Sequence, residues 1–156
     1  MVNKNALNFQ KFKGKHLLAI DFGEKFTGIS TYKVDIDPYP LLWGRLAYES
    51  DPQMISQILK ICESEVIDIL ILGLPRLLDG QETSMTSRIR LFYQSLQKAW
   101  NPEDVYLQDE TLSSFEAQER MKSSPQFNFK VDMRQIDAVA ASIIMEEFVS
   151  SDKLEQ

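Results

Sequence analysis

The stretch LLAIDFGEKFTGIS, residues 17–30, decides the fold of this chain. Its first four residues form a continuous apolar run, which is typical of a strand that is buried on both faces. Two glycines then bracket a tight turn, and residues 29–32 have the pattern of a returning strand. The stretch therefore predicts a hairpin with one carboxylate, Asp21, at the end of its first strand.

Outside this hairpin, strand and helix patterns alternate along the chain. Strands are predicted at 41–48, 66–72 and 105–108, and helices at 51–62, 89–96, 113–121 and 136–149. The order β-β-β-α-β-α-β-α-α predicts an α/β fold, with one five-stranded mixed sheet covered by helices on both faces. Three antiparallel strands come first, and alternating helices and strands follow. Chemistry in such sheets gathers at the carboxyl ends of the parallel strands.

Length and composition limit the class of protein. A chain of 156 residues has room for one domain, expected over residues 15–150, after a flexible basic arm at 1–14 and before a tail at 151–156. No apolar run is long enough for a bilayer, and the N-terminus lacks the core of a signal peptide, so no membrane partner is expected. One cysteine excludes an internal disulfide framework within the chain. We expect a cytoplasmic protein whose chemistry depends on carboxylates.

The charge distribution leaves nucleic acid open as a partner. The 23 acidic and 17 basic residues give a net charge of −6, whereas phosphate-binding proteins are usually basic. The basic residues are unevenly spread, however, and gather in residues 1–16, 76–98 and 120–134. A local positive surface is therefore compatible with the sequence, and a solvated surface of mixed charge is the alternative.

Acidic residues stand where predicted elements begin or end. Asp21 follows the first strand, Asp109 and Glu110 follow the last one, and Asp137 opens the final helix on its small apolar face. Only one of residues 109 and 110 can face a shared site, because successive side chains of a strand alternate. Carboxylates brought together raise one another's pKa unless a cation is present, and oxygen ligands favour Mg²⁺ or Mn²⁺. Such a cluster suits a two-metal site, with ions about 3.5–4 Å apart, for phosphodiester hydrolysis.

Each of these acids also has a purely structural interpretation. Asp21 can be a turn residue before Gly23, and Glu110 can be a solvated strand end. Asp137 can favour its helix through the macrodipole. The three placements together at one predicted sheet edge favour a site over three separate coincidences.

Four blocks of sequence resemble the YqgF/RuvX family of the ribonuclease H-like superfamily. They read AIDFGEKFTG at 19–28, LGLPRLLDG at 72–80, DETLSSFEA at 109–117 and IDAVAA at 136–141. The resemblance implies a ribonuclease H-like fold and a metal-dependent nuclease that processes the 5′ end of pre-16S rRNA. A Holliday-junction resolvase of the same chemistry is the alternative, and a nucleic-acid-binding module that has lost catalysis is a third interpretation.

The resemblance also assigns the expected site. Carried over by motif, Asp21, Glu110 and Asp137 are the expected catalytic and metal-binding residues, with Asp109 as the second choice beside Glu110. The expected cofactor is Mg²⁺ or Mn²⁺, and the expected partner is nucleic acid, RNA rather than DNA, bound by a monomer or homodimer. The basic residues expected to bind substrate are Lys25, Arg76, Lys130 and Arg134.

The sequence departs from the family pattern at positions that concern substrate. Phe26 and Thr111 stand where the family usually has basic residues, and Leu77 stands where it often has asparagine. These departures predict weaker positioning of substrate with an intact carboxylate set. Lys25 and Arg76 are expected to compensate, as is Arg134.

Overall fold

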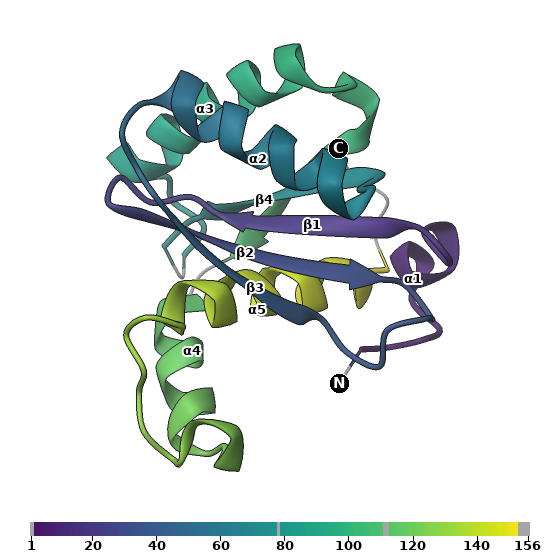
Figure 1. The fold of residues 1–156 in the computed structure, drawn as a ribbon, viewed down its shortest axis with the longest axis vertical. Helices are drawn as coiled ribbons and strands as arrows, with labels where there is room; N and C mark the ends of the chain where they lie inside the picture. The colour runs from purple at the N-terminus through teal and green to yellow at the C-terminus, as the bar shows by residue number, and fades with distance from the viewer. Residues whose placement is uncertain (1, 78, 111–112, 153–156) are drawn as a thin grey trace.

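The structure, a computed structural model, describes residues 2–77, 79–110 and 113–152 (Figure 1). Its centre is a five-stranded sheet in the order β3-β2-β1-β4-β5, antiparallel from β3 to β1 and parallel from β1 to β5. The predicted mixed sheet is therefore confirmed. The strands are β1 (His16–Asp21), β2 (Phe26–Lys33), β3 (Leu41–Ala47), β4 (Ile69–Pro75) and β5 (Val105–Glu110).

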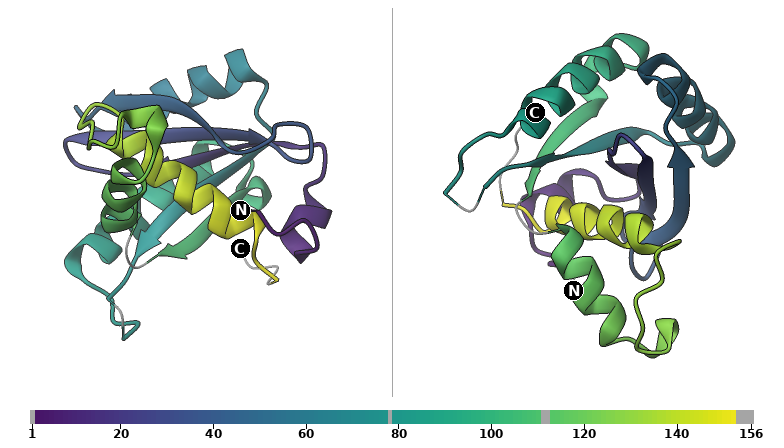
Figure 2. Two further views of the ribbon diagram at one scale, coloured as in Figure 1. Left: turned by 90° about the horizontal axis from the view of Figure 1, so that it is seen from below. Right: turned by 90° about the vertical axis from the view of Figure 1, so that its left-hand side faces the viewer.

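Helices cover both faces of the sheet, as predicted (Figures 1 and 2). Side chains of β1 alternate between the two cores: Leu18 packs with α2 and α3, and Leu17 packs with α5 and α1. The helix α4 packs against α5 and projects from the body of the molecule. The helices are α1 (Leu7–Lys11), α2 (Asp51–Glu65), α3 (Ser84–Ala99), α4 (Ser113–Lys122) and α5 (Ile136–Val149), with short 3₁₀ turns η1 (Pro102–Asp104) and η2 (Pro125–Phe127).

The segment before β1 is folded onto the sheet, so the flexible arm expected over residues 1–14 is wrong for its central part. Phe9 and Phe12 are buried, and the Phe12 ring lies 5.4 Å from the ring of Phe148 in α5. The side-chain amide of Asn8 donates to the carbonyl oxygen of Phe148 at 2.8 Å. Aromatic burial and a satisfied buried amide hold this short helix, although its lysines make the segment polar in sequence.

The start of α2 has a serine N-cap and an aspartate that contacts a second helix. Ser50 is the N-cap, and its hydroxyl accepts the backbone N–H of Gln53 at 3.2 Å. Asp51 is the first helical residue, and its carboxylate accepts from Arg88 of α3 at 3.0 Å. Asp51 therefore joins α2 to α3, although aspartate is also a common N-cap residue.

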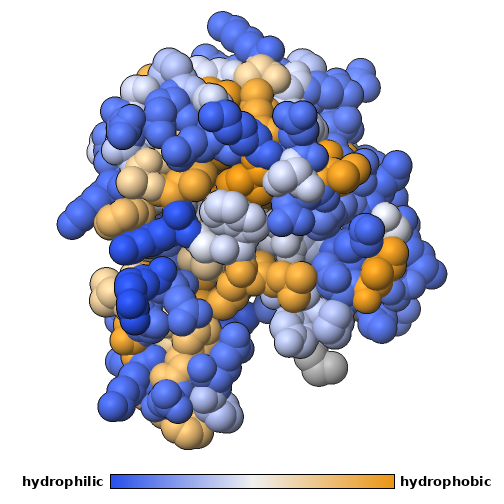
Figure 3. All heavy atoms as spheres, viewed as in Figure 1, coloured by the Kyte–Doolittle hydropathy of each residue, from blue (hydrophilic) through white to orange (hydrophobic). Residues whose placement is uncertain are grey.

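Polar side chains predominate on the face drawn in Figure 3. Within the described ranges, no helix is both long and apolar enough to cross a membrane. The carboxyl ends of β1, β4 and β5 lie on one side of the molecule, together with the β1–β2 turn and the first turn of α5 (left in Figure 1, facing the viewer in the right panel of Figure 2). This is the end at which the predicted site residues fall.

Candidate active site

A row of residues crosses the sheet at the carboxyl end of β1, with Asp21 at its centre. Gly28 of β2 pairs with Asp21, and Arg45 of β3 pairs with Gly28. On the other side the β1–β4 pairing ends at Ile20 and Leu72, so Gly73 is the neighbour of Asp21 in β4. Paired residues point to the same face of a sheet, and this row is on the face that α5 covers.

Two glycines of this row let other acidic residues approach Asp21. A Cβ atom on Gly28 would collide with the carbonyl oxygen of Asp137, so only glycine allows the first turn of α5 to lie this close to β2. A Cβ atom on Gly73 would collide with Ile144 of α5 and would lie 3.5 Å from the carboxyl carbon of Glu110. Asp137 therefore approaches Asp21 from the β2 side, and Glu110 approaches from the β4 side.

The three carboxylates interact electrostatically. Burial raises the pKa of Asp21 well above its usual value, and the negative charges of Glu110 and Asp137 raise it further. Glu110 is only 7% exposed. Burial also raises the pKa of Asp137, although the nearby Arg45 opposes that shift. The three carboxylates that the sequence singled out thus come from three separate elements, and the charges of Glu110 and Asp137 act on Asp21.

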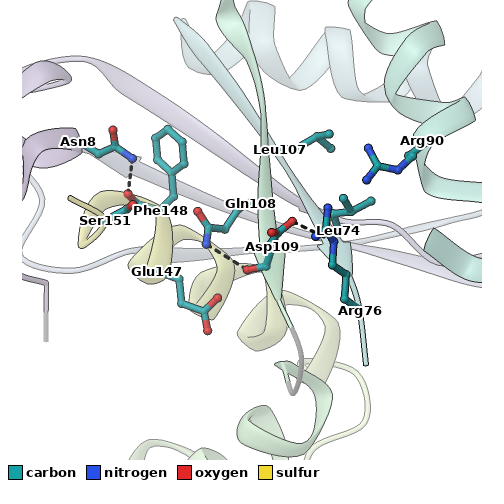
Figure 4. A pocket seen from close by; sticks show the side chains of 10 residues that line it. All are labelled: Asn8, Leu74, Arg76, Arg90, Leu107, Gln108, Asp109, Glu147, Phe148 and Ser151. Carbon is teal, nitrogen blue, oxygen red and sulfur yellow. Dashed lines mark hydrogen bonds and ion pairs between the residues drawn. The ribbon is translucent and has the colours of Figure 1, made fainter. Parts of the chain in front are cut away.

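The alternation of β5 distinguishes Glu110 from its neighbour. Glu110 pairs with Pro75 and lies on the α5 face, whereas Asp109 pairs with Leu74 and points to the opposite face. There Asp109 forms an ion pair with Arg76, with 3.5 Å between Oδ1 and Nε, and its side chain is 59% exposed (Figure 4). Asp109 is therefore directed away from Asp21.

The expected substrate-binding residues occupy different places. Lys25 is exposed in the β1–β2 turn and lines a pocket of about 430 Å³ beside Asp137. Arg76 lines another pocket, at the edge of β5, whose lining residues come from both faces of the sheet and include Asp109 and Glu147 (Figure 4). Lys130 and Arg134 are exposed in the loop that leads into α5. Lys25 thus lines the same pocket as Asp137, whereas Arg76 pairs with Asp109.

Sequence reasoning missed one cation at this end of the sheet. Arg45 Nη1 lies 3.9 Å from Asp137 Oδ2, and the guanidinium stacks on the Phe26 ring at 3.7 Å from its centroid. Nothing in the local pattern of β3 marks this arginine. Only its pairing with Gly28 places it in the row of Asp21. Phe26 stands where the family usually has a basic residue, and the guanidinium of Arg45 from the next strand lies over its ring. Thr111, the other position where a basic residue is replaced, lies outside the described residues.

The donor set suits a hard divalent cation. Within residues 2–77, 79–110 and 113–152, no three His, Cys, Asp or Glu side chains stand close enough together to hold a metal ion. The acids around Asp21 nevertheless offer oxygen atoms alone, which is the chemistry that Mg²⁺ and Mn²⁺ prefer. The raised pKa of Asp21 means that its ionised form is destabilised by burial and by two like charges, and a cation offsets both effects.

Solved structures with the same fold define the class of protein. The Thermus thermophilus RuvC in complex with a Holliday junction substrate matches with a TM-score of 0.54 and 9% identity, over 83% of this chain and 91% of that one. The yeast mitochondrial Holliday junction resolvase Ydc2 matches with a TM-score of 0.53 and 11% identity, over 92% and 81%. The protein is therefore an α/β protein of the ribonuclease H-like fold, with acidic residues gathered at the strand ends.

Sequence comparison defines the family. The profile of the RuvX family, described as Holliday junction resolvase, matches residues 15–151. Relatives include proteins of Maridesulfovibrio salexigens (32% identical, 86% of this chain and 97% of that one), Orientia tsutsugamushi (35%, 85% and 82%) and Rickettsia africae (32%, 98% and 99%). Each bears the name "Putative pre-16S rRNA nuclease". The chain belongs to the RuvX family, which confirms the resemblance seen in its sequence.

Proposed function

We propose that this chain is a divalent-metal-dependent nuclease that hydrolyses phosphodiester bonds and processes the 5′ end of pre-16S rRNA in the cytoplasm. The observation that carries the proposal is the electrostatic interaction of Glu110 and Asp137 with the partly buried Asp21 at the carboxyl end of β1. The names of the three relatives support the class of reaction and the RNA substrate. Each relative also matches this chain over most of its own length.

Asp21, Glu110 and Asp137 are the residues that would hold the metal. When bound there, a divalent cation stabilises charge on the phosphodiester oxygens and lowers the pKa of water. The protein's own part is to hold the acids in place: Asp21 and Glu110 come from rigid strands, and Asp137 comes from a helix that is packed directly on Gly28. The positive end of the α5 dipole also favours an anionic phosphate near Asp137.

Cleavage assays with the purified chain test this function. The substrates are an end-labelled 5′ leader of pre-16S rRNA and a four-way DNA junction, each with Mg²⁺ and with Mn²⁺. We expect metal-dependent cleavage of the leader, and a loss of about 10³-fold in Asp21→Asn, since the metal site is worth several kcal/mol. The control variant Lys98→Met, in the last turn of α3, should cleave like the wild type.

Two further measurements separate loss of the site from loss of the fold. Asp21→Asn should melt no lower than the wild type, because burial and two like charges disfavour the aspartate's charged form. Calorimetric titration with Mn²⁺ should show binding to the wild type and weakened binding to Asp21→Asn. Binding of the leader without cleavage under both metals would contradict the proposal and favour a module that only binds nucleic acid.

Resolution of four-way DNA junctions is the second candidate function. The description of the matching family and the fold shared with RuvC support it. A resolvase cuts at two symmetry-related points and therefore needs a two-fold dimer, whereas a trimming nuclease can act as a monomer. Paired cuts in the junction by a species that sediments as a dimer would favour this candidate over rRNA processing.

A further inference from the structure

A pocket of about 430 Å³ adjoins the carboxylates on the side of β3. It lies between the β1–β2 turn, β3 and residues 133–137, and Asp137 forms part of its wall. Its volume falls in the range of about 300–1,000 Å³ that is usual for small-ligand pockets. We refer to it as the β3 pocket. Its lining residues are Gly23, Glu24, Lys25, Phe26, Arg45, Met133, Ile136 and Asp137.

We propose that the β3 pocket is the subsite for a nucleotide next to the scissile bond, where Arg45 binds that nucleotide's phosphate and Met133 contacts its base or sugar. The proposal rests on the nuclease function proposed above and deepens it. It adds a phosphate-binding residue that neither the local sequence pattern nor the four expected basic residues included.

The pose of Arg45 suits a phosphate. The central carbon of its guanidinium lies over the Phe26 ring, 3.7 Å from the centroid, in a cation–π contact that restrains the position of the group. Its protein contacts are long: Nη1 donates to the carbonyl oxygen of Met133 at 3.4 Å and lies 3.9 Å from Asp137 Oδ2. The side chain is 30% exposed. A planar guanidinium held in place in this way can offer two parallel N–H groups to a phosphate.

Arg88 shows what a structural arginine looks like in the same protein. Its guanidinium donates to Asp51 Oδ2 at 3.0 Å and to the Tyr48 hydroxyl at 3.1 Å, and it joins α3 to the start of α2. Its short hydrogen bonds raise its pKa and lower that of Asp51. Within the described residues, the polar contacts of Arg45 are one long hydrogen bond and one loose ion pair, which an incoming phosphate can displace at low cost while the contact with Phe26 stays.

The charges of the pocket favour an anion at Arg45. Phosphate that approaches the site meets the negative charges of Asp137 and Glu24, in a chain whose net charge is −6. Arg45 and Lys25 are the two cations that line the β3 pocket, and Arg45 Nη1 lies 3.9 Å from the Asp137 carboxylate, which lines it too. This placement lets Arg45 offset the repulsion that the carboxylates exert on the substrate.

The apolar part of the pocket suits a base without selecting its identity. Met133 is 64% exposed although it is a large apolar residue, and its own carbonyl is tied to Arg45. Ile136 lies beside it in the lining. A flexible, polarisable thioether adapts to different flat groups, so we expect contact with any base rather than readout of one.

Binding to single-stranded RNA in the Asp21→Asn background tests the role of Arg45 without cleavage. Affinity is measured by fluorescence anisotropy in Mg²⁺ over a range of salt concentrations for Arg45→Met, Arg45→Lys and the remote control Lys98→Met. Loss of one phosphate contact should lower the slope of log K against log salt by about 0.7 in Arg45→Met. Arg45→Lys should keep most of the slope, and Lys98→Met all of it. Equal slopes for Arg45→Met and Lys98→Met would overturn the proposal.

A scan of modified probes locates the contact. Each probe carries one neutral methylphosphonate in place of a phosphate, and one position should weaken binding when Arg45 is present and have no effect in Arg45→Met. If the loss of affinity from the methylphosphonate and the loss from Arg45→Met are additive at every position, the proposed phosphate contact is wrong. Met133→Ala should weaken binding of the intact probe but not of a probe that is abasic at the same nucleotide. Equal weakening of both probes would overturn the base contact.

The outcomes also distinguish this proposal from the function on which it rests. Arg45→Met keeps an apolar side chain against Phe26, so its melting temperature should stay close to that of the background protein. A wild type that neither binds nor cleaves nucleic acid would overturn both proposals. A wild type that cleaves, with Asp21→Asn inactive and Arg45→Met unchanged in salt slope, would overturn the β3 subsite alone.

Discussion

Gly28 of β2 lies directly against the carbonyl oxygen of Asp137 in the first turn of α5, with no room for a Cβ atom between them. Gly28 is also the residue that pairs with Asp21. The contact therefore sets how closely the helix, and with it the Asp137 carboxylate, approaches the central aspartate. A packing detail of the backbone in this way controls the geometry of the candidate site.

Gly28→Ala is expected to displace the start of α5. The added methyl group overpacks the helix against the sheet, so the free energy of unfolding should fall by about 1–3 kcal/mol. Cleavage should fall further than stability explains, because Asp137 moves away from Asp21. Denaturant unfolding and the leader-cleavage assay check both effects. Gly14→Ala is the control: its Cβ meets nothing within 4 Å, and its positive φ of 82° costs stability without affecting cleavage. A fully active Gly28→Ala protein would contradict the prediction.

Glu110→Gln and Asp109→Asn are expected to behave differently although the residues are adjacent. Glu110 points to the face of Asp21, whereas Asp109 pairs with Arg76 on the other face. Glu110→Gln should lose cleavage by about 10²-fold or more, because a charged ligand of the proposed metal site is removed. Asp109→Asn should keep cleavage within about threefold, since an exposed ion pair contributes little. Rates of the two variants are measured side by side on the leader substrate. The opposite ranking would mean that Asp109, and not Glu110, acts at the site of Asp21.

Glu147 of α5 should make stability depend on pH. Burial, together with the negative charges of Glu116, Glu110 and Glu146, raises its pKa from 4.5 to about 7. The folded state then binds more protons than the unfolded state between about pH 4.5 and 7, so the free energy of unfolding falls as pH rises through that window. Glu147→Gln should remove this part of the slope and raise the melting temperature at pH 7.5. Urea unfolding at several pH values, with the exposed Glu63→Gln as control, measures the effect. If the free energy of unfolding of Glu147→Gln depended on pH as steeply as that of the wild type, burial of Glu147 would not be the cause of the dependence.

Asn8→Leu tests whether the N-terminal helix contributes to the fold. The variant removes the hydrogen bond from the Asn8 amide to the Phe148 carbonyl, which still accepts the backbone N–H of Ser151 at 3.2 Å, so the loss should cost about 0.5–1.5 kcal/mol. Gln10→Leu is the matched control, because Gln10 is exposed and bonds only within its own segment, to the carbonyl of Lys4. Thermal unfolding compares the two. Equal melting temperatures for Asn8→Leu and Gln10→Leu would indicate that residues 1–14 form a flexible arm, as the sequence predicts.

Much of the fold and part of the site could be predicted from sequence. The apolar run before Asp21, the glycine-bracketed turn and the final helix are local patterns, and local patterns depend on residues close together in the chain. The strand ends then placed Asp21, and either Asp109 or Glu110, at the rim of the sheet, because parallel strands share a carboxyl edge. The buried helix that contains Phe9 was missed, since five residues are too few for a helical period to stand out.

The sequence by itself therefore determined the order of the elements and the residue types available for chemistry. Tertiary structure decided which of two adjacent acids faces Asp21, how closely α5 approaches Gly28, and that Arg45 stands beside Asp137. The physical reason is that these three outcomes depend on strand register and on the packing of a helix against a sheet. Both bring together residues far apart in the chain, and no local pattern of residue types records those contacts.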